Sequence, residues 1–520
     1  MGGRVKKQAV NGTFLDRALN FIERAGNKLP HPVTLFVIIA AIVVIASAIM
    51  GTLGASVVLE QMDSESQQAT MVTVRARSLL DADGIRFMFE KAVTNFTGFA
   101  PVGVVLVAML GIAAADGTGL LNACLRKLLI NTPKRVVTAV VVLIGVLSNV
   151  ASDSGYVVVV PLGAMVFLSM KRHPMAGIAA AFFGVAGGFS ANFLLGSIDP
   201  LLGSFSTAGA QILDPHYYVS PVANYYFMFV STILITAIGT LITERITEPR
   251  LGAYQGEMQA NMETLAPNEN RGLRWALAAL VLTVAGILML VLPANGLLRN
   301  QVTGDVLGDS PFMNSIVIIV AMLFFFPGVC YGVGAKTIQN DKQLVNMISE
   351  IMGGMGGYLV LTFVASQFVA YFQYSNIGLI LAVKGAEVLK STHATGLALM
   401  ILFVFVTAVI NLFIGSAVTK WSVMAPVFVP MFMMLGLSPE ATQLAFRVGD
   451  SSTNIISPLM PFFAIVLTIA EKYDKKMGIG TMVSIMLPYS ISLLVIWTLF
   501  MAAWVLLGLP LGPGVPTFLA

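Results

Sequence analysis

The chain has 520 residues, of which 57% are hydrophobic and only 11% are charged, and its mean hydropathy is +0.85. A soluble domain carries about 25% charged residues, so this composition excludes a soluble globular protein and indicates a polytopic membrane protein. The net charge of +4 gives no reason to expect a nucleic-acid partner. The two cysteines, Cys124 and Cys330, lack the spacing of a disulfide or zinc framework.

The first 31 residues are polar and basic, and we expect them to form a cytoplasmic N-terminal segment. An apolar run without any charged residue then extends from Pro32 to Leu59. It is long enough to cross about 30 Å of hydrocarbon at about 1.5 Å per residue. It lies too deep in the chain and is too long for the core of a secretory signal, so it predicts a retained first helix.

Further apolar runs predict membrane helices along the rest of the chain, near 99–121, 174–196, 222–246, 273–293, 312–335, 349–373, 440–470 and 480–508. Two more apolar regions, near 136–172 and 396–437, are interrupted by polar residues and prolines. Pro161, Pro426 and Pro430 favour broken helices there, because proline removes a backbone donor and clashes inside a helix.

Short loops rich in Lys and Arg indicate the orientation, because such loops stay in the cytoplasm. Placing every basic cluster inside predicts about nine crossings, a cytoplasmic N-terminus and a periplasmic C-terminus. The two interrupted regions must then return to the side from which they came. The expected fold is therefore an all-α polytopic membrane protein with about nine transmembrane helices and two re-entrant helical hairpins.

The two interrupted regions resemble each other and predict an inverted repeat. Each has a serine-containing hairpin, a short link ending in proline, and an apolar helix that breaks into small polar residues, GGFSANFLLG at 187–196 and GDSSTNIISP at 449–458. The predicted organisation is a first membrane half at 32–246, a cytoplasmic linker at 247–272, a second half at 273–510 and a C-terminal tail at 511–520. Inverted repeats with discontinuous helices are typical of secondary transporters.

Several polar residues within these regions are candidates for chemistry, each beside a purely structural alternative. Asp199 is a site carboxylate or the cap of the next helix. Asp450 and Asn454 lie one helical turn apart and offer oxygen ligands for Na⁺ or a proton cycle. Arg447 could bind a substrate carboxylate, or could pair with Asp450 three residues away.

The residues near the chain breaks and hairpin tips have similar alternatives. Asn192 either joins a cation cage or repairs freed backbone groups, and Asp153 lies at the expected tip of the first hairpin. Trp421 either stacks on an aromatic substrate or packs in the interior. Lys420 either attracts a carboxylate or extends its charge towards the membrane surface.

Enzyme signatures fail on inspection. The segment GVGAKT at 332–337 lacks the glycines of a phosphate-binding loop, and no HExxH motif is present. Ser416 and Lys420 sit in proline-flanked hairpin sequence that disfavours a catalytic dyad. The sequence RVGD before Ser451 lacks the first glycine of the GxGD pattern of intramembrane aspartyl proteases. We therefore expect no enzymatic activity.

The chain resembles the aminobenzoyl-glutamate transporter (AbgT) family along nearly its full length. The resemblance is carried by the strings GNKLPHP (26–32), NFTGFAP (95–101), KRHPMAG (171–177), SANFLLGSIDPLL (190–202), TERITEPRLG (243–252), WSVMAPVFVPMF (421–432), FRVGDSSTNIISP (446–458) and GLPLGPGVP (508–516). It implies nine transmembrane helices with two re-entrant hairpins, a homodimer with a cytoplasm-facing aqueous basin, and a location in a bacterial inner membrane.

The resemblance also implies which residues take part in transport. Functional positions of the family fall on Asp199, Trp421, Pro439, Arg447, Asp450, Asn454 and Pro458. The chain departs from the family at Val418, where some members carry serine, although Ser416 is retained two residues earlier. It also departs at Lys420, where Gln or Ile is associated with the family. Both departures bear on substrate preference.

Together these features predict a secondary active transporter of p-aminobenzoyl-glutamate, related folate fragments or sulfonamide antimetabolites, coupled to H⁺ or Na⁺. Substrate would contact Trp421, Arg447, Lys420, Asp199, Pro439, Pro458 and Ser416. The coupling ion would contact Asp450, Asn454, Asn192 and Asp153, with Na⁺ at Asp450 and Asn454 as the only cofactor. The alternative is a passive ion or solute channel, because polar re-entrant hairpins also build selectivity filters.

Overall fold

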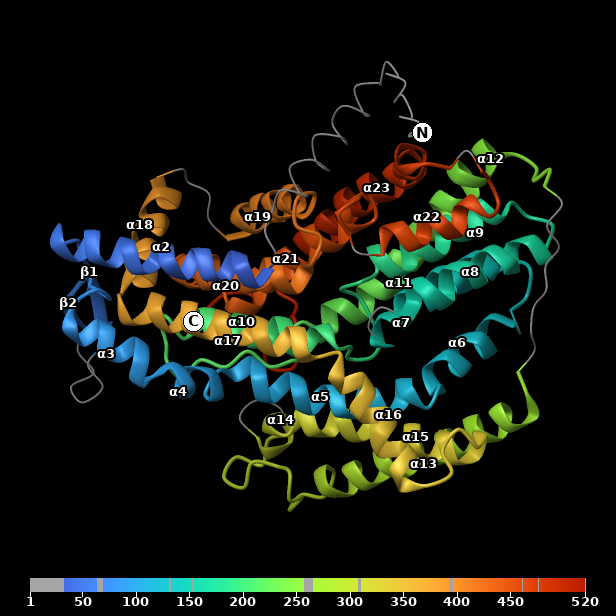
Figure 1. Cartoon of the computed structure of the whole chain (residues 1–520), viewed down its shortest axis with the longest axis horizontal. Coiled ribbons are helices and arrows are strands. Elements are labelled where there is room, and N and C mark those ends of the chain that lie inside the picture. The colour runs from blue at the N-terminus through green and yellow to red at the C-terminus, as the bar shows by residue number, and fades with distance from the viewer. Residues whose placement is uncertain are drawn as a thin grey trace, which may run out of the picture.

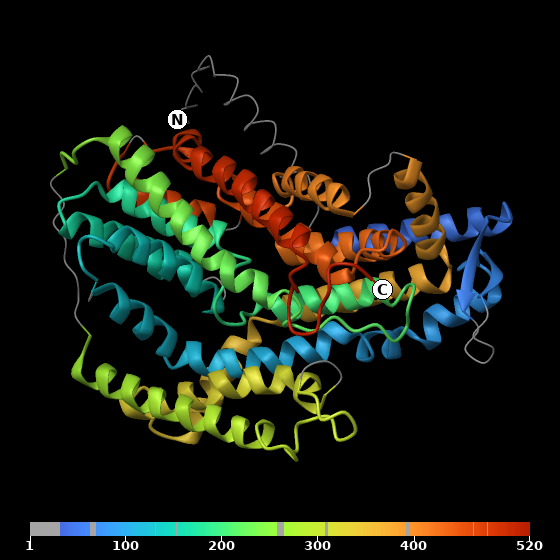
Figure 2. The same ribbon diagram turned by 180° about the vertical axis from the view of Figure 1, so that it is seen from behind.

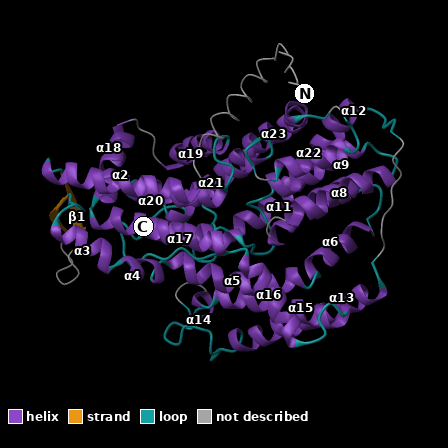
Figure 3. Cartoon of the chain, in the orientation of Figure 1, coloured by secondary structure: helices purple, strands orange, loops and turns teal. Residues whose placement is uncertain are grey.

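A computed structural model of the chain describes residues 32–62, 69–130, 132–151, 154–256, 265–306, 310–391, 396–460, 462–475 and 477–519. The predicted N-terminal segment at 1–31 lies outside the described residues. The described chain is mostly helical, as the composition predicts (Figure 3).

The first half contains the first chain break, which lies between η2 and α10. Its elements are α2 (Pro32–Thr52), β1 (Ser56–Met62), β2 (Ala69–Arg75), α3 (Ala82–Glu90), α4 (Ala92–Thr97), α5 (Ala100–Gly117), α6 (Leu120–Ile130), α7 (Val137–Ser148), the 3₁₀ turn η1 (Asn149–Ala151), α8 (Ser154–Ser169), α9 (Pro174–Phe182), the π-helical turn η2 (Phe183–Gly187), α10 (Ile198–Ala210), α11 (Tyr225–Ile242), the π-helical turn η3 (Thr243–Thr247) and α12 (Glu248–Leu251).

The second half begins after the linker and contains the second chain break. Its elements are α13 (Pro267–Val291), α14 (Pro311–Asn314), α15 (Ile316–Ala335), α16 (Asp341–Gly353), α17 (Gly356–Tyr374), α18 (Ile377–Ser391), α19 (Gly396–Asn411), α20 (Ala417–Met433), α21 (Pro439–Asn454), α22 (Phe463–Glu471) and α23 (Ile479–Leu506).

Among the described residues, five helices are long and apolar enough to cross a membrane singly, and the number rises to eight if each of three bent helix pairs is one span. The bent pairs join α5 to α6, α16 to α17 and α18 to α19, with bends of 60°, 47° and 110°. Helices α7, α8 and α20 are apolar but shorter. A multi-pass membrane protein is therefore confirmed, whereas the predicted nine crossings remain a prediction.

The helices form two regions that meet along α5 (Figures 1 and 2). Helices α13 and α15 pack together at one edge, and α15 and α16 pack on α5. On the other side of α5 lie α7 to α11 and α19 to α23, which include both chain breaks. The main apolar core lies in this second region, where α10 packs on α20 and α21.

The structure contains two short strands that the sequence analysis did not predict. Strands β1 and β2 pair antiparallel, with Ser56 opposite Arg75, at the end of the molecule near α2 and α3 (Figure 3). The segments SVVLEQM and ATMVTVR contain several β-branched residues, which favour extended pairing. These β-branched residues are the sequence signal for the two strands.

Two expectations about the chain breaks are wrong. Pro161 lies inside a continuous α8, and Pro426 and Pro430 lie inside a continuous α20. Packed neighbours in a membrane protein tolerate the missing hydrogen bond, so proline alone does not divide these helices. The second break also starts later than GDSSTN predicts, because α21 continues to Asn454. The first break, between η2 and α10, lies where it was predicted.

The two halves repeat one packing detail. In the first half, a Cβ built on Gly184 would lie 2.3 Å from the carbonyl oxygen of Val142 on α7. In the second half, a Cβ on Gly449 would lie 2.3 Å from the carbonyl oxygen of Val404 on α19. Such close approach admits only glycine. This shared contact makes α7 the counterpart of α19, and the helix that ends in η2 the counterpart of α21.

The asparagines at the ends of α7 and α19 show the same correspondence between the two halves. Asn149 and Asn411 each lie seven residues after the valine of that contact. The Nδ2 of Asn149 donates to the carbonyl oxygen of Val185 at 3.0 Å, and that of Asn411 donates to the carbonyl oxygen of Asp450 at 2.7 Å. Val185 and Asp450 each follow the glycine directly, so the two halves place equivalent residues in equivalent contacts.

A polar anchor joins Arg172, just before α9, to α12 at the start of the linker. The Nε of Arg172 donates to Glu248 Oε1 at 2.8 Å and its Nη1 donates to Thr138 Oγ1 at 2.8 Å. Burial lowers the pKa of the neighbouring His173, although Asp474 and Glu248 oppose this shift. The neutral ring can therefore accept the backbone N–H of Met175 on Nδ1, at 3.2 Å, and cap α9.

We expect Arg172→Gln to lower the free energy of unfolding by about 2 kcal/mol, because it removes partly buried charge-assisted hydrogen bonds. Arg86→Gln is the control, because Arg86 pairs with Asp83 three residues away and both side chains are more than two-thirds exposed. It should cost less than about 1 kcal/mol. Thermal unfolding of the detergent-purified proteins measures both effects, and equal losses would contradict the assignment.

Candidate functional site

A small pocket, with a cavity volume of about 20 Å³, lies beside the first chain break. Its wall includes Asn149, Ser190, Asn192, Asp199, Asn224 and Tyr225. The Oδ1 of Asn149 and the Oγ of Ser190 are buried and have no hydrogen-bond partner within the described part of the chain. Unpaired polar atoms at the wall of a pocket suit a polar ligand or water.

Asp199 connects this pocket to the second half of the protein. It lies in the first turn of α10, where its Oδ2 accepts the backbone N–H of Gly196 at 2.7 Å. Its Oδ1 accepts Nη1 of Arg447 on α21 at 2.7 Å. The expectation that Asp199 caps α10 is wrong, because Ser197 is the N-cap and Asp199 bonds the preceding loop and Arg447 instead. Its role as a site carboxylate stays a prediction.

Arg447 lies on α21 with 1% of its side chain exposed. Its Nε is buried without a hydrogen-bond partner among the described residues. The alternative in which Arg447 pairs with Asp450 along the same helix is wrong, because Arg447 reaches across to the first half instead. A buried guanidinium with a spare donor is suited to a second carboxylate.

Asp450 pairs with Lys420 on α20, and neither side chain has any exposed surface. Lys420 Nζ also donates to Asn411 Oδ1. Asn411 Nδ2 in turn donates to Asn454 Oδ1 at 2.9 Å, and Asn454 Nδ2 donates to Asp450 Oδ2 at 3.3 Å. Asp450 and Asn454 are thus brought together as predicted. Lys420 is fully buried, so the expectation that its charge extends towards the membrane surface is wrong. Its binding of a substrate carboxylate stays a prediction.

Trp421 lies next in sequence and is completely buried. Its Nε1 donates to the carbonyl oxygen of Leu202 at 3.1 Å and to Ser206 Oγ at 2.9 Å on α10. Its ring lies 4.5 Å from the ring of Phe446. In this conformation the indole joins α20 to α10 and has no exposed face for a substrate.

The remaining predicted residues have mainly local contacts. Asn192 Nδ2 donates to the carbonyl oxygen of Val146 and its Oδ1 accepts the N–H of Leu194, both at 3.2 Å, so it repairs freed backbone. Ser416 caps α20, and Pro439 is the first residue of α21. Pro458 lies in the break after α21. Asp153 lies outside the described residues.

Three residues that the sequence analysis did not single out complete the contact between the halves. Ser206 Oγ donates to Gln443 Oε1 at 2.6 Å, and Gln443 Nε2 donates to Asn224 Oδ1 at 2.9 Å. A signal for Gln443 was present, because Glu440, Gln443, Arg447, Asp450 and Asn454 recur at intervals of three and four residues. That spacing places them on one face of α21.

The ion pair between Asp199 and Arg447 can be tested by a double-mutant cycle. Asp199→Asn leaves a buried guanidinium without its counter-charge and should cost about 3 kcal/mol of unfolding free energy, as should Arg447→Gln. The double variant should lose less than the sum of the two, because the second change removes a charge already unpaired. Chemical denaturation in detergent measures the cycle, and strict additivity would contradict a direct interaction.

Comparison with known proteins identifies the family of the chain. Residues 17–519 match the family model described as "AbgT putative transporter family". The p-aminobenzoyl-glutamate transport protein of Escherichia coli is 37% identical over 495 residues, which cover 95% of this chain and 96% of that protein.

Two solved structures are similar over nearly the whole chain. The Alcanivorax borkumensis YdaH transporter is 45% identical, with a TM-score of 0.87, covering 93% of this chain and 100% of that one. Neisseria gonorrhoeae MtrF, described within a class of antimetabolite efflux pumps, is 45% identical with a TM-score of 0.91, covering 96% and 100%. The chain therefore belongs to the AbgT family of membrane transporters.

Proposed function

We propose that this chain is a secondary active transporter of p-aminobenzoyl-glutamate, related folate fragments or sulfonamide antimetabolites. The observation that carries the proposal is the ion pair between the two halves that joins Arg447 to Asp199, a residue of the pocket wall. The relatives described as a p-aminobenzoyl-glutamate transport protein and as an antimetabolite efflux pump support the substrate class.

The guanidinium of Arg447 could exchange the carboxylate of Asp199 for a carboxylate of the substrate. A carboxylate of the substrate would bind the free donor of Arg447 and compete with Asp199 for the guanidinium. Substrate binding would thereby weaken a contact between the two halves. A ligand shifts a conformational equilibrium only through such a differential contact, and here that contact lies at the interface itself.

Trp421 would take part once the halves separate. Its indole bonds to Leu202 and Ser206 of α10, so a movement of α20 away from α10 would release it. The freed ring could stack on the aminobenzoyl ring of the substrate. Ser416, Pro439 and Pro458 would act by shaping the ends of α20, α21 and the following break.

The proposed membrane arrangement has nine transmembrane helices with α7–α8 and α19–α20 as re-entrant hairpins. In this arrangement the basic loops would lie in the cytoplasm with the N-terminus, and the C-terminus would lie in the periplasm of a bacterial inner membrane. The family resemblance further suggests a homodimer, in which the hairpins would move against a fixed scaffold to alternate access. A gradient of H⁺ or Na⁺ would drive transport, acting through Asp450.

Reconstituted proteoliposomes test the substrate role of Arg447. We expect Arg447→Gln to weaken binding of p-aminobenzoyl-glutamate by about ten- to a hundredfold, since a charge-assisted hydrogen bond contributes about 1.5–3 kcal/mol. An uncharged sulfonamide should lose much less, and Arg86→Gln should behave like the wild type. Equal losses for the diacid and the sulfonamide would remove Arg447 from carboxylate recognition.

The same vesicles test coupling and exclude or support a channel. We expect Asp450→Asn to abolish accumulation of labelled substrate against its gradient, because the variant lacks the titratable carboxylate. Counterflow of labelled against unlabelled substrate measures whether the binding site survives. Full gradient-driven transport by the variant would remove Asp450 from coupling, and unsaturable flux without accumulation by the wild type would support a channel.

A further inference from the structure

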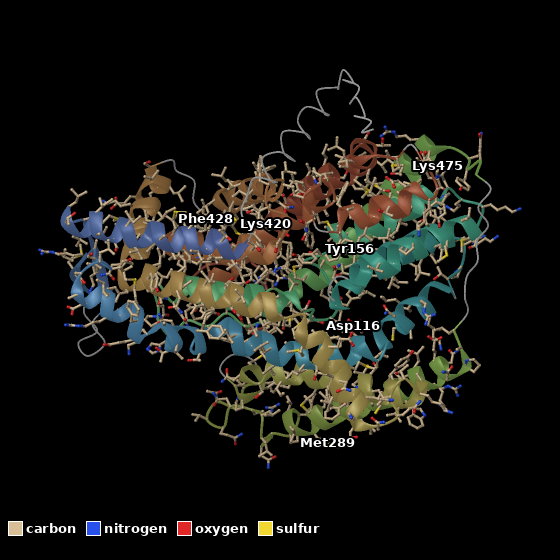
Figure 4. All side chains as sticks on the ribbon, viewed as in Figure 1. Asp116, Tyr156, Met289, Lys420, Phe428 and Lys475 are labelled. Carbon is tan, nitrogen blue, oxygen red and sulfur yellow. The ribbon has the colours of Figure 1, made fainter. Side chains whose placement is uncertain are left out.

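The second half of the protein holds a cation of its own at the place where a coupling ion was expected. Figure 4 labels Lys420 on α20, among the helices of the region with the two chain breaks. Its ammonium contacts the carboxylate of Asp450 and the amide oxygen of Asn411. Both charged side chains are entirely enclosed.

The groups around this ammonium are the ones that a Na⁺ ion would use. Carboxylate and amide oxygens are the ligands that hard cations prefer. Asn454 turns its Oδ1 towards Asn411 Nδ2 and its Nδ2 towards Asp450, so its oxygen is already engaged. The described structure therefore offers oxygen ligands around Asp450, but Lys420 already fills the position of the ion.

The charges of the enclosed cluster also balance without an added ion. Lys420 pairs with Asp450, and Arg447 pairs with Asp199. The other acid on α21, Glu440, accepts from Tyr217 and lies ten residues before Asp450, about 15 Å along the helix. A Na⁺ ion beside Asp450 would thus add an uncompensated charge to a fully buried position, which is strongly unfavourable.

Comparison of the two repeats shows that packing alone does not require this ion pair. Val185 occupies the place in the first half that Asp450 occupies in the second, because each follows the close-packed glycine and accepts the hairpin asparagine. Nine residues after that asparagine stand Val158 in the first half and Lys420 in the second. The contacts of the glycine and the asparagine are therefore built once with a valine and once with the aspartate of a buried ion pair.

We propose that Lys420 is a built-in cation that takes the place of a coupling Na⁺ beside Asp450, so that this chain binds no Na⁺ there and transports without it. The proposal rests on the proposed transport function and specifies the ion requirement of the same site. It also assigns a role to the lysine that distinguishes this chain within the resemblance. Removing the ammonium should convert the site into one that binds Na⁺.

Binding of ²²Na⁺ to the purified protein tests the proposal without any transport substrate. We expect no saturable binding to the wild type and saturable binding of one ion per chain to Lys420→Ala, which vacates the site and leaves Asp450 unpaired. Lys420→Met is the matched control, because it removes the charge but keeps most of the volume. Binding should disappear again in Lys420→Ala combined with Asp450→Asn.

Saturable ²²Na⁺ binding to the wild type that is lost in Asp450→Asn would overturn the proposal, and so would the absence of binding to a folded Lys420→Ala. If Lys420→Ala does not fold, the wild type decides the matter alone. Thermal unfolding in NaCl and in N-methylglucamine chloride should then coincide for the wild type, since only a bound ion stabilises the native state.

Transport by the wild type gives an independent test of the Na⁺ requirement. Replacing Na⁺ by N-methylglucamine on both sides of the vesicle membrane should change the rate by less than about twofold, whereas a loss of about tenfold or more would overturn the proposal. If no transport of p-aminobenzoyl-glutamate or sulfonamide is found while the ²²Na⁺ results hold, the proposed substrates fail and the role of Lys420 stands.

Discussion

The structure depends on one constraint, which is that hydrocarbon satisfies neither the backbone groups freed by a broken helix nor a buried charge. Helices α9 and α21 both end within apolar surroundings, and their ends are satisfied by protein groups. Asn192 bonds the backbone of Val146 on α7 and of Leu194 within the first break, and Ser457 and Ser490 bond backbone oxygens near the second. The polar interior is therefore a consequence of the breaks, and the charges gather where the polar groups already are.

The two buried ion pairs of this interior connect different parts of the protein. The pair of Arg447 and Asp199 runs between the halves, whereas the pair of Lys420 and Asp450 stays within the second half. The two pairs therefore give neighbouring residues of α21 different partners. In our proposals, Arg447 would serve substrate recognition and Asp450 would set the ion dependence.

Much of the fold follows from the sequence by simple physical reasoning. Apolar runs locate the helices α2, α11, α13, α15 and α23, because a long uncharged segment has few alternatives to a membrane helix. The first chain break is also visible, since Gly, Ser and Asn cluster there. Pro161 and Pro426 mislead, because their effect depends on neighbours that supply the missing packing. Strands β1 and β2 are short, and their pairing is a non-local contact that no single segment reveals.

The candidate site was predictable in its members but not in its pairings. Asp199, Arg447, Asp450 and Asn454 stand out as polar residues in apolar surroundings. Arg447 and Asp450 lie three residues apart, which suggests a local ion pair, yet each finds its partner on another helix. Asn411 and Ser206 escaped notice because a single amide or hydroxyl in an apolar helix has many explanations. Only the packing of α10, α20 and α21 shows which groups meet.

The last residues of the chain form a clasp between two parts of the protein. Leu511 accepts the backbone N–H of Tyr226 at 3.1 Å, at the start of α11, while Thr517 accepts the N–H of Ser438 and Leu519 donates to Gly436. Residues 511–519 thereby connect the turn between α20 and α21 to the start of α11. Any rocking of that turn must carry this segment along or unfasten it. In the proposed transport cycle, residues 511–519 would limit the reach of α20 and offer a place to attach a reporter of its movement.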